Sequence, residues 1–194
     1  LAIPSFVGRV LYLDGDTLIR RDLTPLLRYD LQGSAVGAAL CPTHLSWWYK
    51  SRSKLRPGYE RNNAVTVQRL SQLGFSTIER YVNSGVMLVD VDRLNVLKLT
   101  DDFSDTEKAA SYRWHDQDHI NVVCRDNINI LDSTYNSIWG NLTLRNDVIP
   151  RALRASQCEA MTNPVIVHFA GKQKPWRHDK QRIGMKLRQL TTRR

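Results

Sequence analysis

The chain has 194 residues, of which 42% are hydrophobic, and a formal net charge of +9, which predicts one globular domain or most of one. No apolar run approaches the roughly 20 residues of a membrane-spanning helix, and no signal peptide is visible. The cysteines have no metal-binding spacing such as C-x-x-C, which predicts reduced, packed thiols and a reducing compartment. They are Cys41, Cys124 and Cys158.

The first predicted element is a buried strand at residues 7–13, which ends in Asp14 and Asp16 on either side of Gly15. Because side chains alternate along a strand, both carboxylates would point the same way, and they repel each other without a cation between them. Open α/β sheets bind ligands at such strand ends. The alternative is a plain turn, since Asp-Gly-Asp is also good turn chemistry.

Further along the chain, Thr24-Pro25 predicts the start of a short helical turn, and the small apolar residues 34–40 predict a second strand. Residues 41–63 carry many aromatic and basic side chains. One interpretation is a packed surface segment. The other is a flap that contacts an acceptor, because aromatic rings stack on sugar faces and cations attract acidic groups.

Apolar spacing predicts a helix at residues 64–73 that ends at Gly74. A strand is predicted at residues 86–91, with Asn83 just before it. Asp92 is the expected cap of the helix that follows.

A helix is also expected after Trp114, with Asp116 or Asp118 as its N-cap and Gln117 exposed. The alternative interpretation gives two of these residues functional roles: Asp116 would contact a sugar hydroxyl, and the Gln117 amide would lie near the reacting carbon. The pattern alone leaves both interpretations open.

Short strands are predicted at residues 128–131 and 164–167, and His168 follows the second strand. Residues 140–163 carry only a weak pattern. Strands that alternate with helices predict an α/β domain with a mixed sheet.

Polar residues at three strand ends can converge on one crevice: Asp14 and Asp16, Asn83, and His168. Two carboxylates and one imidazole form an oxygen-rich site that favours Mn²⁺ or Mg²⁺ over a structural zinc. The alternative for His168 alone is a hydrogen-bonded histidine at a strand end.

The loop that follows His168 strengthens the metal interpretation. Gly171 permits a tight turn, Lys174 supplies a positive charge, and Pro175-Trp176 stiffens the exit. Such a loop can hold a diphosphate.

The sequence resembles glycosyltransferase family 8, and most nearly its bacterial lipopolysaccharide galactosyl- and glucosyltransferases. Four ordered motifs carry this resemblance: residues 11–17 (LYLDGDT), 82–90 (VNSGVMLVD), 116–121 (DQDHIN) and 168–176 (HFAGKQKPW). It implies the GT-A nucleotide-diphospho-sugar transferase fold, a Mn²⁺-bound UDP-sugar donor, and hexose transfer with retention of the anomeric configuration.

The resemblance also implies a role for individual residues. Asp14, Asp16 and His168 match the metal ligands, and Asp14 also lies among the substrate contacts. Gly171 and Lys174 match the loop that grips the diphosphate.

Four further residues match the part of the family site that holds the sugar. Asn83 and Gly85 match contacts to the donor sugar, Asp116 would hold sugar hydroxyls, and Gln117 matches the residue beneath the anomeric carbon. The resemblance therefore implies Gln117 and Asp116 as the catalytic pair.

In this family about a third of the catalytic domain precedes the acidic motif, and that portion has no counterpart in these 194 residues. We therefore expect a catalytic domain at residues 1–176 that lacks its N-terminal nucleotide-binding part. The competing hypothesis is a truncated or degenerate module that binds glycan or membrane without turnover.

The charge is concentrated at the C-terminal end: residues 172–194 carry nine of the 28 Lys/Arg and one of the 19 Asp/Glu, a net charge of +8 against +1 for the remainder. The tail at residues 177–194 has Ile183, Leu187 and Leu190 at helical spacing, which predicts a basic amphipathic helix. It would dock on its own domain or attach to anionic lipid.

The lipid interpretation of the tail predicts a cytoplasmic protein, peripheral on the inner face of the cytoplasmic membrane. A nucleic-acid partner is not expected, because such a surface would spread its charge over a face of the domain. A weaker alternative gives nucleic-acid binding to the tail alone.

Overall fold

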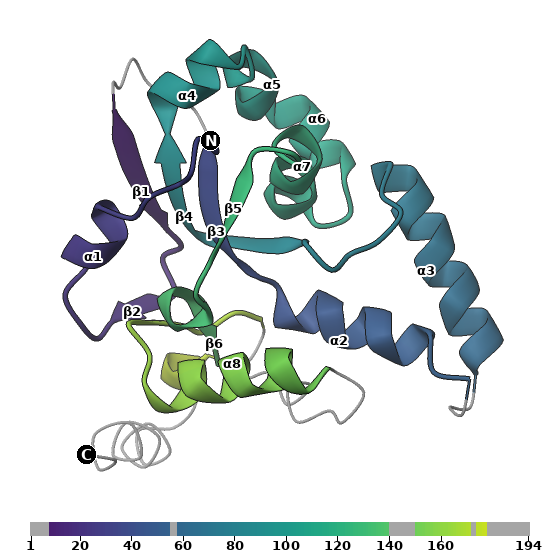
Figure 1. Cartoon of the computed structure of the whole chain (residues 1–194). Helices are drawn as coiled ribbons and strands as arrows, with labels where there is room; N and C mark the ends of the chain where they lie inside the picture. Colours follow the sequence, from purple (N-terminus) through teal and green to yellow (C-terminus); the bar gives the residue numbers. More distant parts are fainter. Residues whose placement is uncertain (1–7, 55–57, 140–149, 172–173, 178–194) are drawn as a thin grey trace.

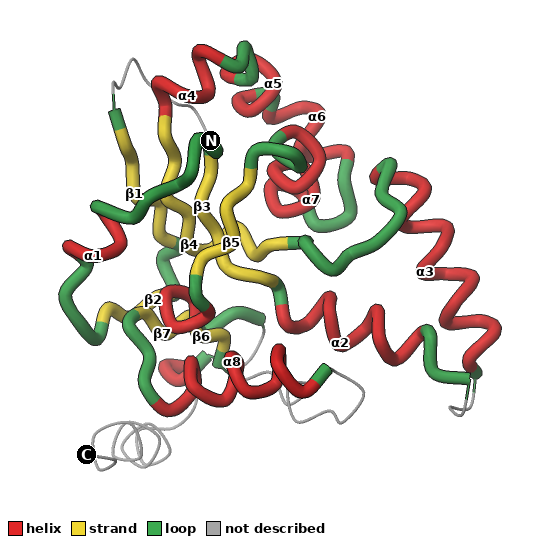
Figure 2. The backbone as a smooth tube through the Cα atoms, in the orientation of Figure 1, coloured by secondary structure: helices red, strands yellow, loops and turns green. Residues whose placement is uncertain are grey.

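The computed structural model describes residues 8–54, 58–139, 150–171 and 174–177. Its centre is a four-stranded sheet with the order β1-β4-β3-β5 (Figures 1 and 2). These strands are β1 (Arg9–Leu13), β3 (Val36–Leu40), β4 (Val82–Asp90) and β5 (Ile128–Leu131). Strand β4 runs antiparallel to β1 and β3, whereas β3 and β5 are parallel, so the predicted α/β fold with a mixed sheet is confirmed.

A second, smaller sheet with the order β2-β7-β6 is not predicted by the sequence pattern. It consists of β2 (Thr17–Ile19), β7 (Ile166–His168) and β6 (Ser137–Ile138). Because β1 passes through one turn into β2, the two sheets meet at the acidic motif. The backbone N–H of Phe169 donates to the carbonyl oxygen of Asp16 at 3.0 Å and ties the end of β7 to this turn.

In Figure 1, helices α4 to α7 lie along one side of the large sheet, α2 and α3 extend away from it, and α8 lies beside the small sheet. Helices α2 and α3 pack against each other, α7 packs against β4, and α5 and α6 pack against α7. Their bounds are α1 (Thr24–Leu27), α2 (Pro42–Ser51), α3 (Tyr59–Leu73), α4 (Val91–Val96), α5 (Thr100–Ser104), α6 (Thr106–Ser111), α7 (His115–Val123) and α8 (Arg151–Thr162). Short 3-10 turns lie at Ser133–Asn136 and Pro175–Arg177.

The largest buried cluster lies between the large sheet and helices α4, α5 and α7. Leu94, Phe103 and Ile120, one from each helix, belong to the same buried cluster as Val36 and Met87 of the sheet. Burying such side chains contributes about 1.5–3 kcal/mol each. This core holds α7 against β4, so the beginning of α7 faces the beginning of β4.

Three strand predictions need correction. Strand β1 is an edge strand of the large sheet and only partly buried, so the prediction of a buried strand there is wrong. Strand β4 begins at Val82, so Asn83 lies inside it and not before it. His168 is the last residue of β7 and does not follow it.

Both predicted helix caps are also wrong. Helix α4 is capped by Asp90, whose carboxylate accepts from the backbone N–H of Arg93 at 2.9 Å. The N-cap of α7 is Trp114. Asp118 lies inside the helix and reaches back to accept from the Trp114 N–H at 2.9 Å, which satisfies one of the donors that a helix start leaves free.

Most of the described residues in the segment 41–63 belong to α2 and to the beginning of α3. Trp48 of α2 is buried with Leu70 and Leu73 of α3, and the Arg52 guanidinium lies 4.4 Å from the centre of the Trp48 ring. This favours the packed interpretation over the flap. Helix α3 begins five residues before its predicted start and ends, as predicted, before Gly74.

The thiol prediction holds for two of the three cysteines. Burial raises the pKa of Cys41 to about 11 and that of Cys124 to about 12, which keeps both thiols protonated and unreactive. Cys158 is exposed on α8, a helix that the sequence pattern does not predict.

The basic helix predicted in the tail, at residues 178–190, lies outside the described residues. In the described part of the chain, none of the helices combines the length and the apolar character needed to cross a membrane.

Candidate active site

The acidic motif lies where β1 of the large sheet turns into β2 of the small one. The Asp14 N–H donates to the carbonyl oxygen of Gly85 at 2.8 Å, which continues the β1–β4 pairing past the end of β1. The Thr17 N–H and hydroxyl then both donate to the Asp14 carbonyl oxygen, at 3.2 and 2.8 Å. The motif is therefore a turn, as one alternative predicted, and this turn directs both carboxylates to one point.

That point is His168, the last residue of β7. Its Nε2 atom lies 3.5 Å from Asp14 Oδ2 and 3.2 Å from Asp16 Oδ1. One ligand atom from each residue lies within 4.8 Å of the other two. Two carboxylate oxygens and an imidazole nitrogen suit Mn²⁺ or Mg²⁺. This acid–histidine cluster (Asp14, Asp16 and His168) thus fits the divalent cation that the sequence predicts.

The surroundings of His168 also fit a metal ligand. Only 3% of the residue is exposed, and burial lowers the pKa of His168 below its usual value, although Asp16 and Asp14 act in the opposite direction. The other ring nitrogen, Nδ1, lies 3.0 Å from Asn136 Oδ1. An imidazole that donates from Nδ1 to Asn136 would leave Nε2, on the side of the two acids, for a metal ion.

Gly85 of β4 makes room for the cluster. A Cβ atom at this position would lie 2.2 Å from His168 Cε1 and 2.8 Å from Asp14 Oδ2. Any side chain at residue 85 therefore displaces two members of the cluster. Gly85 is not among the residues that line the neighbouring pocket, and its contact with a donor sugar stays a prediction.

Lys174 and Gly171 lie beside the cluster. The Lys174 ammonium forms an ion pair with Asp16 and donates to the carbonyl oxygen of Phe169 at 2.6 Å. Gly171 has a φ of +89°, a conformation that glycine adopts at no steric cost, so the tight turn predicted there is present. The role of both residues in binding a diphosphate stays a prediction.

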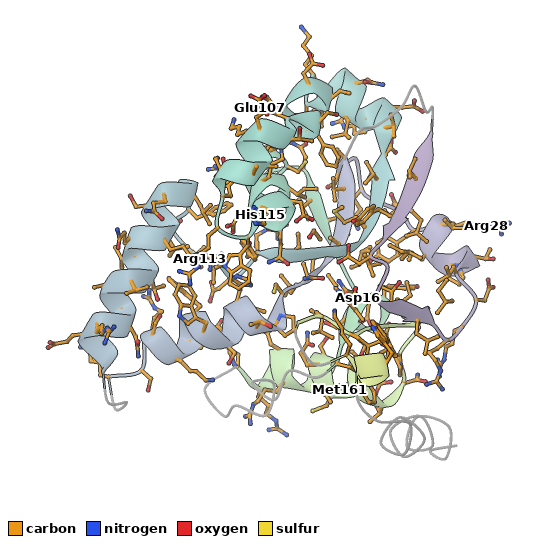
Figure 3. The ribbon with its side chains drawn as sticks, turned by 180° about the vertical axis from the view of Figure 1, so that it is seen from behind. Asp16, Arg28, Glu107, Arg113, His115 and Met161 are labelled. Atoms are coloured by element: carbon orange, nitrogen blue, oxygen red, sulfur yellow. The ribbon has the colours of Figure 1, made fainter. Side chains whose placement is uncertain are left out.

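An open pocket of about 630 Å³ adjoins the cluster. Figure 3 labels three residues that line it: Asp16, and the exposed Arg113 and His115 at the start of α7. The predicted site residues in its lining are Asp14, Asp16, Asn83, Asp116, Gln117, His168 and Gly171. Segments from both sheets and from α7 therefore meet at one pocket, and the predicted convergence of Asp14, Asp16, Asn83 and His168 on one crevice is confirmed.

Inside this pocket, Asp116 and Gln117 are held by residues of β4 and by Tyr81. The Ser84 hydroxyl donates to Asp116 Oδ2 at 3.0 Å. Asn83 Nδ2 donates to Gln117 Oε1 at 2.6 Å, and Gln117 Nε2 donates to the Tyr81 hydroxyl at 3.2 Å. Gln117 is buried, so the interpretation in which it is an exposed residue of a capped helix is wrong.

Sequence reasoning missed Tyr12, Ser84 and Asn136. The Tyr12 hydroxyl donates to Asp14 Oδ1 at 2.9 Å, and burial together with this hydrogen bond raises the pKa of Tyr12 to about 12. Strand alternation could have found Tyr12, because residues 12 and 14 share a face. Asn136 lies in a 3-10 turn, and no local pattern marks it.

The mixed sheet, with an acidic motif at the end of one strand, matches the GT-A fold of solved glycosyltransferases. A solved structure of the WbbM bifunctional glycosyltransferase superposes with a TM-score of 0.70 at 20% identity, over 87% of this chain and 30% of that one. The galactosyltransferase LgtC, solved with donor and acceptor sugar analogs, gives a TM-score of 0.62 at 22% identity, over 97% of this chain and 61% of that one.

The chain belongs to glycosyl transferase family 8, whose family model matches residues 1–180. A curated relative is the lipopolysaccharide 1,2-glucosyltransferase of Escherichia coli (strain K12), which is 28% identical over 178 residues. That alignment covers 88% of this chain and 44% of the relative. The chain thus spans less than half of this relative and less than two thirds of the solved structures.

Proposed function

We propose that the protein is a retaining, metal-dependent glycosyltransferase that moves a hexose, galactose or glucose, from a UDP-sugar to lipopolysaccharide or another surface glycan. The observation that carries the proposal is the acid–histidine cluster, which opens into a pocket lined by Asp116 and Gln117. Membership of the family supports a transferase, and the name of the E. coli relative supports this class of acceptor.

The cluster would hold Mn²⁺, or Mg²⁺, through Asp14, Asp16 and His168. When bound, such a cation stabilises negative charge on a leaving diphosphate. Lys174 exchanges its ion pair with Asp16 for the diphosphate, and Gly171, which has no side chain, lets the backbone approach it.

Asn83, Gly85 and Asp116 contact the donor sugar, and Gln117 lies beneath its anomeric carbon. An amide is a poor nucleophile, and both ends of the Gln117 amide already have hydrogen-bond partners. This supports attack of an acceptor hydroxyl from the face on which UDP departs. The new bond joins the acceptor oxygen to the anomeric carbon as the bond to the diphosphate breaks, and the hydroxyl proton passes to the departing oxygen, whose charge Lys174 stabilises.

The basic residues 177–194 support a further element of the proposal, attachment to the inner face of the cytoplasmic membrane. Near an anionic surface each Lys or Arg contributes about 1 kcal/mol. Binding of the full chain to anionic vesicles, compared with neutral vesicles and with DNA, tests this element.

Isothermal titration of UDP into the full chain, with and without Mn²⁺, tests the site itself. We expect binding that requires both Mn²⁺ and Asp16, and therefore no binding to an Asp16→Ala variant. Asp22→Ala is the matched control, because Asp22 is an exposed acid that caps a turn through Thr24, outside the residues that line the pocket. Binding that ignores both Mn²⁺ and Asp16→Ala would contradict the proposal.

Turnover is tested by hydrolysis of UDP-glucose and UDP-galactose in the presence of Mn²⁺. Hydrolysis of one donor that is lost in Asp16→Ala supports an enzyme and identifies the sugar. A chain that binds UDP and Mn²⁺ but turns over neither donor would support the non-catalytic module.

A further inference from the structure

A second cavity, of about 620 Å³, lies beside the active-site pocket, and the proposed function makes no use of it. Its lining comes from α3, from the turn between α6 and α7, and from α7 itself. We call it the α3 cavity. Arg113 lines both this cavity and the active-site pocket, and Figure 3 shows it between α3 and α7. The α3 cavity therefore adjoins the place where the sugar transfer is proposed.

The lining of the α3 cavity carries an excess of positive charge. It contains the guanidinium groups of Arg69 and Arg113, and Asp118 is the one acid among the described residues that line it. The Asp118 side chain is only 2% exposed and pairs with Arg69 Nη2 at 2.9 Å. It also accepts from the Tyr81 hydroxyl and from the Trp114 N–H. Its charge is therefore neutralised within the protein, and the charge of Arg113 remains.

Both arginines keep donors for a ligand. The hydrogen bonds of Arg69 within the described residues use Nη2, and its Nε–H is buried without a partner there. A buried donor of this kind is uncommon, and it calls for an acceptor from outside the chain. Arg113 is exposed, and in the described part of the chain its guanidinium has an aromatic neighbour, the Trp114 ring at 5.9 Å, but no ion pair. Guanidinium groups fit phosphate and carboxylate groups closely.

The rest of the lining suits a sugar. Gln68 and Gln72 on the exposed side of α3, together with Ser111, offer amide and hydroxyl groups, and Tyr112 offers a half-buried aromatic ring. On the side of the active-site pocket, Trp114 is 46% exposed. Amides and hydroxyls form hydrogen bonds with sugar hydroxyls, and aromatic rings pack against sugar faces.

The turn that separates the two cavities is held in one conformation. The Trp114 N–H donates to Asp118 Oδ2 at 2.9 Å, and the His115 N–H donates to the carbonyl oxygen of Tyr112 at 3.2 Å. His115 has a φ of +42°, a left-handed conformation that costs energy for a residue other than glycine. Strain of this kind is concentrated at binding and catalytic sites. The backbone that carries Arg113 is thus fixed between the two cavities.

We propose that the α3 cavity is an acceptor subsite that binds the phosphate or carboxylate group of an acidic sugar. Arg113 binds the anionic group, and Arg69 adds donors from the inner wall. Because Arg113 lines both cavities, the acidic sugar neighbours the sugar that receives the transferred hexose. The role of the bound sugar as an acceptor rests on the proposed function, whereas its binding requires neither Mn²⁺ nor UDP.

NMR titration of the full chain with three glycosides, in the absence of metal and UDP, tests the proposal. The probes are methyl α-glucoside, its 6-phosphate and methyl α-glucuronide, and the signals followed are the arginine Nε–H and tryptophan indole groups. Arg113→Gln identifies the Arg113 signal and removes its charge. Arg61→Gln is the matched control, because Arg61 is an exposed arginine of α3 outside the lining of both cavities.

We expect both acidic glycosides to bind at least about tenfold more tightly than the neutral one, the lower end of what a hydrogen bond to a charged group contributes. Arg113→Gln should remove this preference, and Arg61→Gln should keep it. Gln72→Glu adds a negative charge at an exposed position of the lining and should weaken binding of the acidic glycosides alone. The tighter of the two acidic glycosides identifies the anionic group.

Equal affinity for acidic and neutral glycosides would overturn the proposal, and so would a preference that survives Arg113→Gln. A preference lost in Lys174→Gln but kept in Arg113→Gln would instead assign the anion to the acid–histidine cluster. Inorganic phosphate that binds as tightly as the glucoside phosphate would exclude a contact with the sugar and also overturn the proposal.

The outcome for the subsite and the outcome for the proposed function are distinguishable. If the preference depends on Arg113 but UDP does not bind with Mn²⁺, the subsite stands and the proposed function fails. If UDP binding requires Mn²⁺ and Asp16 but the three glycosides bind alike, the proposed function stands and the subsite fails.

Discussion

The acid–histidine cluster adjoins a chain of buried, hydrogen-bonded side chains of opposite character. This relay consists, in order, of His168, Asn136, Asn83, Gln117, Tyr81 and Asp118. The cluster is charged and partly open: 34% of the Asp14 side chain and 21% of the Asp16 side chain are exposed, and Asp16 pairs with Lys174. The relay is buried, and between His168 and Asp118 it consists of three amides and a phenol. His168 belongs to both parts.

This difference separates what can change in the site from what cannot. Carboxylates and a lysine at a solvent-facing edge can exchange one partner for another, a cation or a phosphate, at little cost. Buried amides have one satisfied arrangement, and any other leaves a polar group without a partner. The rigid relay thus holds in place a charged cluster whose ionic partners can exchange.

The strongest way to break this arrangement is at the contact between the two parts, with Gly85→Ala. The new Cβ would overlap His168 and Asp14, so we expect Mn²⁺ affinity to fall by more than the roughly 10- to 100-fold that an outer-shell loss causes. Overpacking should also destabilise the fold by about 1–3 kcal/mol. Calorimetric Mn²⁺ titration and urea unfolding measure the two effects.

The control for that variant is Gly15→Ala, since a Cβ at Gly15 meets no atom within 4 Å. Equal losses in both variants would mean that a glycine anywhere in this region is required for flexibility, and that the space beneath His168 is not what matters.

Lys174→Gln tests whether the ionic partners of the acid–histidine cluster can exchange. A hydrogen bond to a charged group contributes about 1.5–3 kcal/mol, so affinity for UDP should fall about 10- to 100-fold, while Mn²⁺ affinity without UDP rises because Asp16 is released. Titrations of Mn²⁺ and of UDP, with Lys108→Gln on the exposed side of α6 as the control, separate the two effects. A parallel loss of both affinities would show that Lys174 supports the cluster structurally.

A buried histidine, His44, packs on the Tyr81 ring of the relay and predicts a pH dependence. Burial and the Arg69 guanidinium lower the pKa of His44 to about 3. Below pH 6.5, His44 is therefore protonated in the unfolded chain but stays neutral in the folded chain. The free energy of unfolding falls as the pH drops from 6.5 toward 3. Urea unfolding across this range should show a shallower decline for His44→Asn than for the parent, and no change for the exposed His115→Asn.

The smallest effect is expected for Tyr12→Phe. This change removes one hydrogen bond to a partly exposed carboxylate, Asp14, which should cost about 1 kcal/mol or less. Mn²⁺ titration should give a change of less than about tenfold, the equivalent of 1.4 kcal/mol. A larger change would mean that Tyr12 supports the cluster as rigidly as the relay does.

The acid–histidine cluster and Lys174 could be predicted from the sequence because short-range patterns mark them. Two acids at i and i+2 after an apolar run, and a lysine shortly after His168, can be recognised without any tertiary contact. Most strands of the large sheet were predictable for a similar reason, since runs of small and β-branched residues mark them.

The relay could not be predicted, because its hydrogen bonds join residues far apart in sequence. Asn83 and Gln117 are 34 residues apart, and Asn83 and Asn136 are 53 apart. The pattern even argued against the true extent of β4, since Asn83 and Ser84 are polar residues inside a buried strand, and only their partners in α7 and the 3-10 turn explain them. Helix α8 was not predicted because only Gln157 and Ala160 are buried in it, so it has no clear apolar spacing.

The position of the acid–histidine cluster between two sheets has a thermodynamic consequence. Asp14 follows β1 of the large sheet, and His168 ends β7 of the small one. A cation held by both would act as a reversible cross-link, and binding would add stability to the docked arrangement in proportion to the logarithm of cation concentration. Amide hydrogen exchange in β2 and β7 would then slow as the cation concentration rises, and the small sheet would report the occupancy of the site.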